Sequence, residues 1–173
     1  MIVSAGLNET FEWASPIGIG SNCSIKLSEI ILKQNPKRLI FVGSMGLYDK
    51  SKELFSIYEF NNACNIELSA LDDLAYTPLK FDEIPNLNSS NFICKNYEYA
   101  KKMHEKYGLI GENMECFSFF STARYFNIKA SAILIATNYC DEFAHDEYLK
   151  NTKKANELLE NYLEDKGLLW KNY

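Results

Sequence analysis

Two acidic residues stand where side chains most often do chemistry, at the boundaries of regular structure. Glu115 lies near the start of an expected helix, residues 114–125, and Asp141 comes soon after an apolar run, residues 130–136, that is typical of a buried strand. Two carboxyl groups in one pocket can divide a reaction, because one can hold a proton in a partly buried loop while the other accepts hydrogen bonds. This pair is the first candidate for a catalytic site.

Two glycine-rich segments could bring backbone close to a ligand at the same site. The first, GIGSNCS, contains Gly18 and Gly20 and leads into an amphipathic pattern; the second, Gly43 to Gly46, follows the apolar run 39–42. We expect each to form a turn, since glycine permits tight backbone conformations and close approach to a ligand. Ser44 in the second turn would then offer a hydroxyl to the pocket.

The elements that must position these residues alternate between helices and buried strands. An apolar run at 2–5 predicts a first strand, the segment after Gly20 predicts a helix that Asn35-Pro36 ends, and 39–42 predicts a second, fully buried strand. A helix followed by a buried strand is typical of a sheet covered on both faces, so we expect a three-layer α/β/α domain around a mixed sheet. Further expected elements are strands at 53–60 and 92–94, helices at 98–107 and 146–166, and mostly irregular chain at 63–91 that leaves room for one strand.

Length and composition favour one ordinary globular domain over residues 1–173. Eighteen Lys and Arg against 23 Asp and Glu give a net charge of −5, which argues against a nucleic-acid partner. The five cysteines are spaced singly, without zinc-site spacing, so we expect no metal and a cytoplasmic location. No apolar run is long enough to suggest a membrane segment or a leader.

Three segments in fixed order resemble the nucleoside phosphorylase and nucleosidase superfamily, which includes purine nucleoside phosphorylases and methylthioadenosine/S-adenosylhomocysteine nucleosidases. They are GIGSNCS before a helix, VGSMG after a buried strand, and ENMECFSFFSTARYFNIKASAILIATNYCD. In the third, Met114-Glu115 opens a helix, a buried strand follows, and Asp141 lies in the next loop, as in that family. The resemblance covers most of the chain except about residues 50–90. It implies a reduced phosphorylase/hydrolase-like fold and cleavage of a purine nucleoside.

The resemblance also implies a role for each candidate residue. Asp141 would hydrogen-bond or protonate the purine near N7, Glu115 would accept the ribose 2′- and 3′-hydroxyls, and Met114 would pack under the sugar. Tyr97 would stack on the base. In the second glycine segment, Gly43 and Ser44 would contact phosphate in a phosphorylase or lie near the attacking water in a nucleosidase.

The chain departs from the family pattern in ways that bear on the nucleophile. It is short for the family, and the hairpin expected between the first strand and GIGSNCS is nearly absent. The only arginines, Arg38 and Arg124, do not fall on the family's phosphate positions, which favours water over phosphate. Hydrolytic members use a glutamate after the first strand, but the matching position here is Thr10, so Glu9 or Glu12 would have to replace it.

The sequence therefore predicts a purine nucleoside phosphorylase or nucleosidase that needs no cofactor. Phosphate would be a cosubstrate only if the reaction is phosphorolytic. The alternative is an inactive nucleoside-binding or assembly protein that keeps the fold. The high aromatic content, 14%, and the missing hairpin suggest a homo-oligomer, either a dimer or a trimer-based assembly. Beyond the nucleoside, we expect no nucleic-acid or membrane partner.

Overall fold

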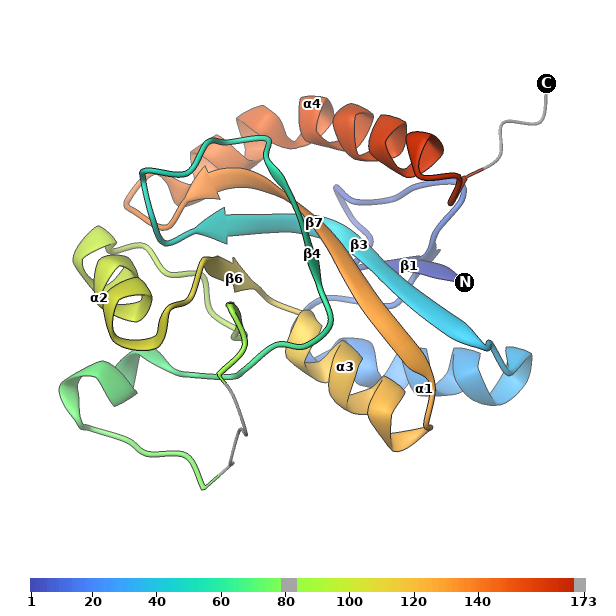
Figure 1. Ribbon diagram of the computed structural model, residues 1–173, viewed down its shortest axis with the longest axis horizontal. Coiled ribbons are helices and arrows are strands. Elements are labelled where there is room, and N and C mark those ends of the chain that lie inside the picture. Colours follow the sequence, from blue (N-terminus) through green and yellow to red (C-terminus); the bar gives the residue numbers. More distant parts are fainter. Residues whose placement is uncertain (79–83, 170–173) are drawn as a thin grey trace.

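A mixed seven-stranded sheet runs between two layers of helices in the computed structural model, which describes residues 1–78 and 84–169 (Figure 1). The strands are β1 (Ile2–Ser4), β2 (Ser15–Pro16), β3 (Arg38–Leu47), β4 (Ile57–Phe60), β5 (Leu87–Ser89), β6 (Gly111–Asn113) and β7 (Lys129–Tyr139). The helices are α1 (Cys23–Gln34), α2 (Tyr97–Tyr107), α3 (Cys116–Tyr125) and α4 (Ala144–Asp165), with 3-10 turns η1 (Gly20–Asn22) and η2 (Leu68–Asp72).

Strand β3 is the centre of the sheet. It pairs in parallel with β1 along one edge and with β7 along the other, where Ser44 lies opposite Ile135. Near its end β3 also pairs antiparallel with β6, with Gly46 opposite Glu112. Strand β4 is antiparallel to β7, and β5 is parallel to β6. The ends of β1, β3, β6 and β7 therefore converge on one region.

The alternation of apolar side chains along β3 explains the layers. Leu39 and Phe41 pack with α1 and α3 on one face, where the rings of Phe41 and Phe119 lie 5.6 Å apart between centroids. Ile40 and Val42 pack against α4 on the other face. Because successive strand residues point to opposite faces, one apolar run serves both cores. The expected three-layer α/β/α arrangement is confirmed.

Two local expectations were wrong. Gly43 to Gly46 is not a turn but part of β3, since β7 continues to pair with it; a register irregularity falls between Met45 and Gly46. The strand expected at 92–94 is absent from that place, and β5 at 87–89 pairs with β6 instead. Phe92 is 82% exposed, so its apolar character does not reflect burial in a sheet.

The four expected helices are present, and the strand expected at 53–60 is β4 at 57–60, whereas β2 and β6 were not expected from the sequence. Asn35 caps the end of helix α1 in the left-handed conformation with φ 45°, and Gly108 caps the end of α2 with φ 70°. Part of the irregular stretch expected at 63–91, residues 79–83, lies outside the described residues, as do residues 170–173 of the expected domain. Within the described ranges, no helix is both long and apolar enough to cross a membrane.

Candidate active site

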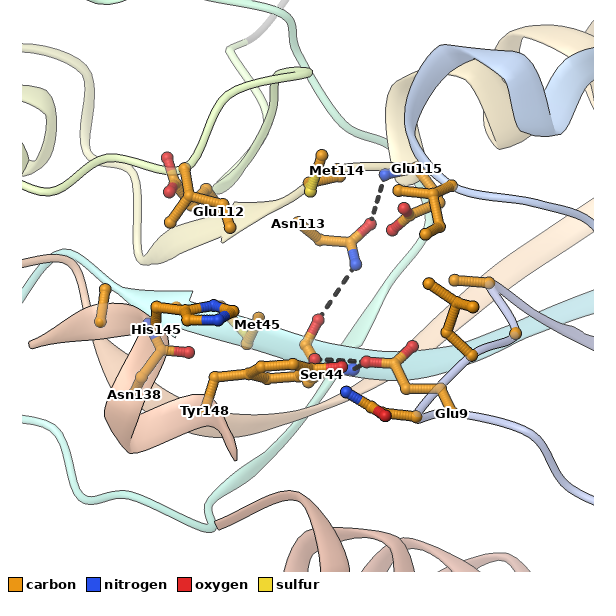
Figure 2. Close-up of a pocket in the computed structure, with 18 residues that line it drawn as sticks. Glu9, Ser44, Met45, Glu112, Asn113, Met114, Glu115, Asn138, His145 and Tyr148 are labelled. Atoms are coloured by element: carbon orange, nitrogen blue, oxygen red, sulfur yellow. Dashed lines mark hydrogen bonds between the residues drawn. The ribbon is translucent and has the colours of Figure 1, made fainter. Parts of the chain in front are cut away.

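A cavity of about 270 Å³ opens where the strand ends converge (Figure 2). Its walls come from the loop after β1, the second half of β3, the end of β6 and the start of α3. The end of β7 and the first turns of α4 complete it. In open α/β sheets, ligands bind beyond the carboxyl ends of the parallel strands, and this cavity occupies that place.

Glu9 supplies a buried carboxyl group on one wall. The loop after β1 turns back at Gly6, whose carbonyl accepts a hydrogen bond from the Glu9 N–H at 3.1 Å. The side chain then lies against Gly43, where a Cβ would come within 2.6 Å of Glu9 Oε2. The β3 glycine is therefore required by the close approach of this carboxyl group.

Ser44 holds the same carboxyl group through two donors. Its backbone N–H donates to Glu9 Oε1 at 3.0 Å, and its hydroxyl donates to the same oxygen. Burial raises the pKa of Glu9 to about 7, although the hydrogen bonds from Ser44 oppose the shift. A carboxyl group with this pKa can take up a proton near neutral pH, as a general base must.

Glu115 supplies a second buried carboxyl group on the opposite wall. Its Oε1 accepts a hydrogen bond from the Gly20 N–H at 2.8 Å, and burial raises its pKa. Asn113 fixes the local backbone: its Oδ1 accepts from the N–H groups of Glu115 and Cys116, both at 2.9 Å, and its Nδ2 donates to the Ser44 carbonyl at 3.0 Å. Asn113 thereby ties the start of α3 to β3.

The far end of the cavity carries an amide. Asn138 near the end of β7 lines the wall, and its Nδ2 donates to the Tyr139 carbonyl at 3.1 Å while its Oδ1 accepts from the Thr137 hydroxyl at 2.9 Å. Figure 2 shows Asn138 and His145 on the side of the cavity away from Glu9. The amide keeps one N–H that these bonds do not use.

A family model described as Phosphorylase superfamily matches residues 69–165. The chain belongs to the phosphorylase superfamily. No curated protein matches the sequence.

The fold is similar to that of Helicobacter pylori futalosine hydrolase, with TM-score 0.78, 14% identity and coverage of 94% of this chain and 95% of the other. Among the other similar structures are two 5′-methylthioadenosine/S-adenosylhomocysteine nucleosidases. The H. pylori protein has TM-score 0.78, 14% identity and 95% coverage of each chain. The Streptococcus pneumoniae protein has TM-score 0.77, 10% identity and coverage of 94% and 95%.

For this superfamily member, the structure brings together four of the residues expected from the sequence. Glu9, Ser44, Met114 and Glu115 all line the cavity. Of the two glutamates that could have replaced the family's base, Glu9 enters the cavity, whereas Glu12 is exposed on the surface and does not line it. Gly43 does not line the cavity but lies directly against the Glu9 side chain.

Two expected residues lie elsewhere. Asp141 is not among the lining residues; its Oδ2 pairs with Lys50 Nζ at 2.7 Å, and its Oδ1 accepts from the Phe143 N–H at 2.9 Å ahead of α4. Tyr97 also lies outside the lining, with Lys50 Nζ 4.4 Å from its ring centroid. The roles that the resemblance gives to Asp141 and Tyr97 stay predictions.

Sequence reasoning missed several lining residues. Asn138 stands three positions before Asp141, and the expected strand, 130–136, stopped just short of it. His145 and Tyr148 face the cavity from the first turns of α4, and their i, i+3 spacing was the available signal. Glu112 is the first residue of the segment ENMECFSFFSTARYFNIKASAILIATNYCD, two positions before Met114, but the sequence analysis gave it no role.

The lining also limits which ligands the cavity can hold. Among the described residues that line it there is no arginine or lysine. Residues 1–78 and 84–169 contain no group of three or more His, Cys, Asp or Glu side chains placed to hold a metal ion. The described part of the cavity therefore offers acids, amides, a serine and an imidazole.

Proposed function

We propose that this chain cleaves the N-glycosidic bond of a purine nucleoside, with water as the nucleophile. The observation that carries the proposal is the pair of buried carboxyl groups, Glu9 and Glu115, on opposite walls of one cavity. Membership of the phosphorylase superfamily supports the reaction class. The similar structures, a hydrolase and nucleosidases, agree with it.

Glu9 is the general base of the proposed reaction. In its deprotonated form it takes a proton from a water molecule, and the hydroxide oxygen bonds to C1′ of the ribose as the C1′–N9 bond breaks. The pKa of about 7 suits this task, because the group is partly deprotonated at neutral pH and still basic enough to remove a proton. Ser44 keeps the carboxyl group oriented through its two hydrogen bonds.

Glu115 and Asn138 act on the two halves of the substrate. Glu115 accepts hydrogen bonds from ribose hydroxyls, and Met114 beside it contacts the sugar. The departing purine keeps the electron pair of the broken bond, and the spare N–H of Asn138 stabilises that negative charge. An amide cannot give up a proton, so the proton taken up by Glu9 returns through solvent to complete the free base. Water and nucleoside thus give free ribose and free purine.

Water is favoured over phosphate by the charges around the cavity. Phosphate is usually held by bidentate arginine contacts or by lysine, and the described lining supplies neither. Two buried carboxyl groups would also repel a phosphate dianion. No cofactor enters the proposed reaction.

The test is release of free base, measured by chromatography, from inosine, guanosine, adenosine and methylthioadenosine with and without phosphate. We expect release without phosphate, and a loss of about a hundredfold or more in kcat for Glu9→Gln. Release that requires phosphate would indicate a phosphorylase. Binding of nucleosides by calorimetry without any release would support the nucleoside-binding alternative instead.

A further inference from the structure

The turn that carries Glu9 has a backbone conformation that needs support from outside. Gly6 and Leu7 both lie in the left-handed region, with φ 95° and 54°. This conformation is costly for Leu7, and because its side chain is 75% exposed, its own burial offsets little of the cost. The Glu9 N–H closes the turn on the Gly6 carbonyl at 3.1 Å. Contacts from the rest of the fold must therefore hold the turn and the proposed general base with it.

Helix α4 carries a polar stripe that reaches this turn. Four polar side chains recur at every fourth position, which places them on one face of the helix: Tyr148, Thr152, Asn156 and Glu160. Asn156 Nδ2 donates to the Asn8 carbonyl at 3.0 Å, and the Asn8 side chain hydrogen-bonds to the Tyr148 hydroxyl. One helical turn beyond Asn156, Glu160 accepts a hydrogen bond from Trp13 Nε1 at 3.2 Å. Three members of the stripe therefore contact the chain around Glu9.

Apolar packing joins the same loop to the same helix. The rings of Phe11 and Trp13 stack with 4.4 Å between their centroids, and both pack against the cluster that contains Ala155 and Leu159 of α4. Figure 1 shows this loop alongside the C-terminal half of α4. Residues 5–14, all of them described, contain no helix and only the isolated bridge between Gly6 and Glu9. Helix α4 thus supplies support that the loop lacks by itself.

We infer that Asn156 is a positioning residue for Glu9, and that the polar stripe of α4 fixes the general base in the cavity. This inference rests on the proposed role of Glu9 and adds how the chain places that residue. Asn156 does not line the cavity, so it can act on the reaction only through the turn. Ser44 holds the carboxyl group, and Asn156 holds the backbone one residue before it.

Loss of the Asn156 donor should change the burial of Glu9. Burial is the main cause of the raised pKa of Glu9, and the hydrogen bonds from Ser44 oppose it. When the turn loosens, water reaches the carboxyl group, and the pKa falls from about 7 toward its ordinary value. The carboxylate is then also held less firmly against the attacking water, so the plateau of kcat/KM should fall.

The other titratable groups around Glu9 must keep their charge in the comparison. They come from three further elements and are Glu115 and Cys116 at the start of α3, Glu112 of β6, and His145 and Tyr148 of α4. Glu115 repels the Glu9 carboxylate and raises its pKa. Asn156→Leu replaces one neutral side chain by another of similar size, so it changes none of these charges. A shift in the titration of Glu9 then reports the position of the turn.

The test is the titration of Glu9 itself, followed by the NMR signal of its carboxyl carbon and assigned with Glu9→Gln. The unaltered protein is compared with Asn156→Leu and Asn151→Leu. Asn151 is the matched control, since it also lies on α4 and donates to a backbone carbonyl, that of Thr137, at 2.8 Å. We expect the midpoint to fall by about half a unit to one unit in Asn156→Leu. It should stay at about 7 in Asn151→Leu.

Base release provides a second readout. The plateau of kcat/KM should fall about threefold to tenfold in Asn156→Leu, with the midpoint of its pH profile displaced in the same direction. Asn156→Ala, which also removes the donor, replaces Asn156→Leu if melting curves show that the latter does not fold. A Glu9 midpoint that does not move in the Asn156 variant, or that moves equally in Asn151→Leu, would overturn this inference. A displaced midpoint in a protein that releases no base would overturn the proposed reaction and leave the positioning of Glu9 intact.

Discussion

At the scale of single residues, the pKa of Glu9 makes the proposed reaction depend on pH. The base must be deprotonated, so kcat/KM should rise as pH increases through about 7 and then level off. Ser44→Ala removes a hydrogen bond that lowers this pKa, so the midpoint should move to higher pH. The pH–rate profile of both proteins, measured on the best nucleoside, tests the assignment.

A matched serine controls for general effects of the Ser44 substitution. Ser28 lies on α1, where its hydroxyl donates to the Ser24 carbonyl at 2.7 Å. Ser28→Ala should leave the pH–rate profile unchanged. If the midpoint of the pH–rate profile does not move in Ser44→Ala, or moves equally in Ser28→Ala, Glu9 is not the general base.

Asn138 and Asp141 are alternative candidates for the residue that contacts the departing base. Asn138→Ala should lower kcat by about a hundredfold to a thousandfold, the usual effect of losing a donor that stabilises developing negative charge. Asp141→Asn breaks the pair with Lys50 and should mainly lower Tm. Single-turnover rates and melting curves of both variants separate the two assignments. A rate loss in Asp141→Asn as large as in Asn138→Ala would favour the role given by the resemblance.

The sequence could identify several site residues but not their orientation. Glu115 and Met114 were found because they belong to a motif of the family that the sequence resembles. Glu9 was named, together with Glu12, as a replacement for the glutamate that hydrolytic members of that family carry after the first strand. Asn138 was missed because the end of a strand is the least certain feature of a sequence pattern, and three residues separate it from the more conspicuous Asp141. Nothing in the sequence alone indicates that Asp141 pairs with Lys50 and lies outside the cavity lining.

At the scale of elements, two strand glycines are needed for different reasons, one for the position of a site residue and one for strand pairing. A Cβ at Gly43 of β3 would come within 2.6 Å of Glu9 Oε2, the flexible end of a side chain. A Cβ at Gly111 of β6 would come within 2.1 Å of the backbone carbonyl oxygen of Gly46. Gly43→Ala should therefore displace the base and lower kcat on the order of a hundredfold, with little change in Tm. Gly111→Ala should separate β6 from β3 and destabilise the fold by about 1–3 kcal/mol.

Thermal melting and kcat of these two variants form a matched pair. In a domain of this size, each kcal/mol corresponds to about 2–4 °C in Tm. Equal loss of stability in both variants would contradict the distinction between a site glycine and a pairing glycine.

The elements that the sequence failed to predict share one cause. Gly43 to Gly46 was expected to turn because glycine is common in turns, but Glu9 lies directly against Gly43, the side chains of Asn138 and Cys140 lie directly against Gly46, and β7 pairs with the whole segment. A strand within 63–91 was left open, but its place was not predicted: β5 has the sequence Leu-Asn-Ser, which lacks β-branched or aromatic residues, so only its pairing with β6 and the burial of Asn88 explain it. Tertiary contacts overrode local propensity at both places.

At the scale of the whole molecule, the three-layer arrangement could be predicted because it depends on repeated local patterns. The apolar runs that became β3 and β7 are buried on both faces, which requires helices on each side. The shape of the cavity could not be predicted, since it depends on where seven strands end relative to one another.

Apolar side chains around the mouth suggest that a second copy of the chain covers it. Leu7 is 75% exposed, Ile93 47% and Ile19 42%, although all three line the cavity. Exposed apolar groups that gather at one place favour an interface. We expect a homodimer with twice the 19.9 kDa mass of one chain by light scattering. Leu7→Glu should weaken it on the order of a hundredfold or more, because a symmetric interface contains each residue twice.

Ile25 on α1 provides the control for this prediction. Its side chain is 73% exposed, nearly as much as that of Leu7. However, α1 covers the face of the sheet opposite α4 (Figure 1), and Ile25 does not line the cavity. Ile25→Glu should therefore keep the dimeric mass. Because the second copy would close the mouth and exclude water from the base, Leu7→Glu should also raise KM as the protein dissociates, and higher protein concentration should restore it. A monomeric mass for the unaltered protein, with full activity, would show that the cavity works without a partner.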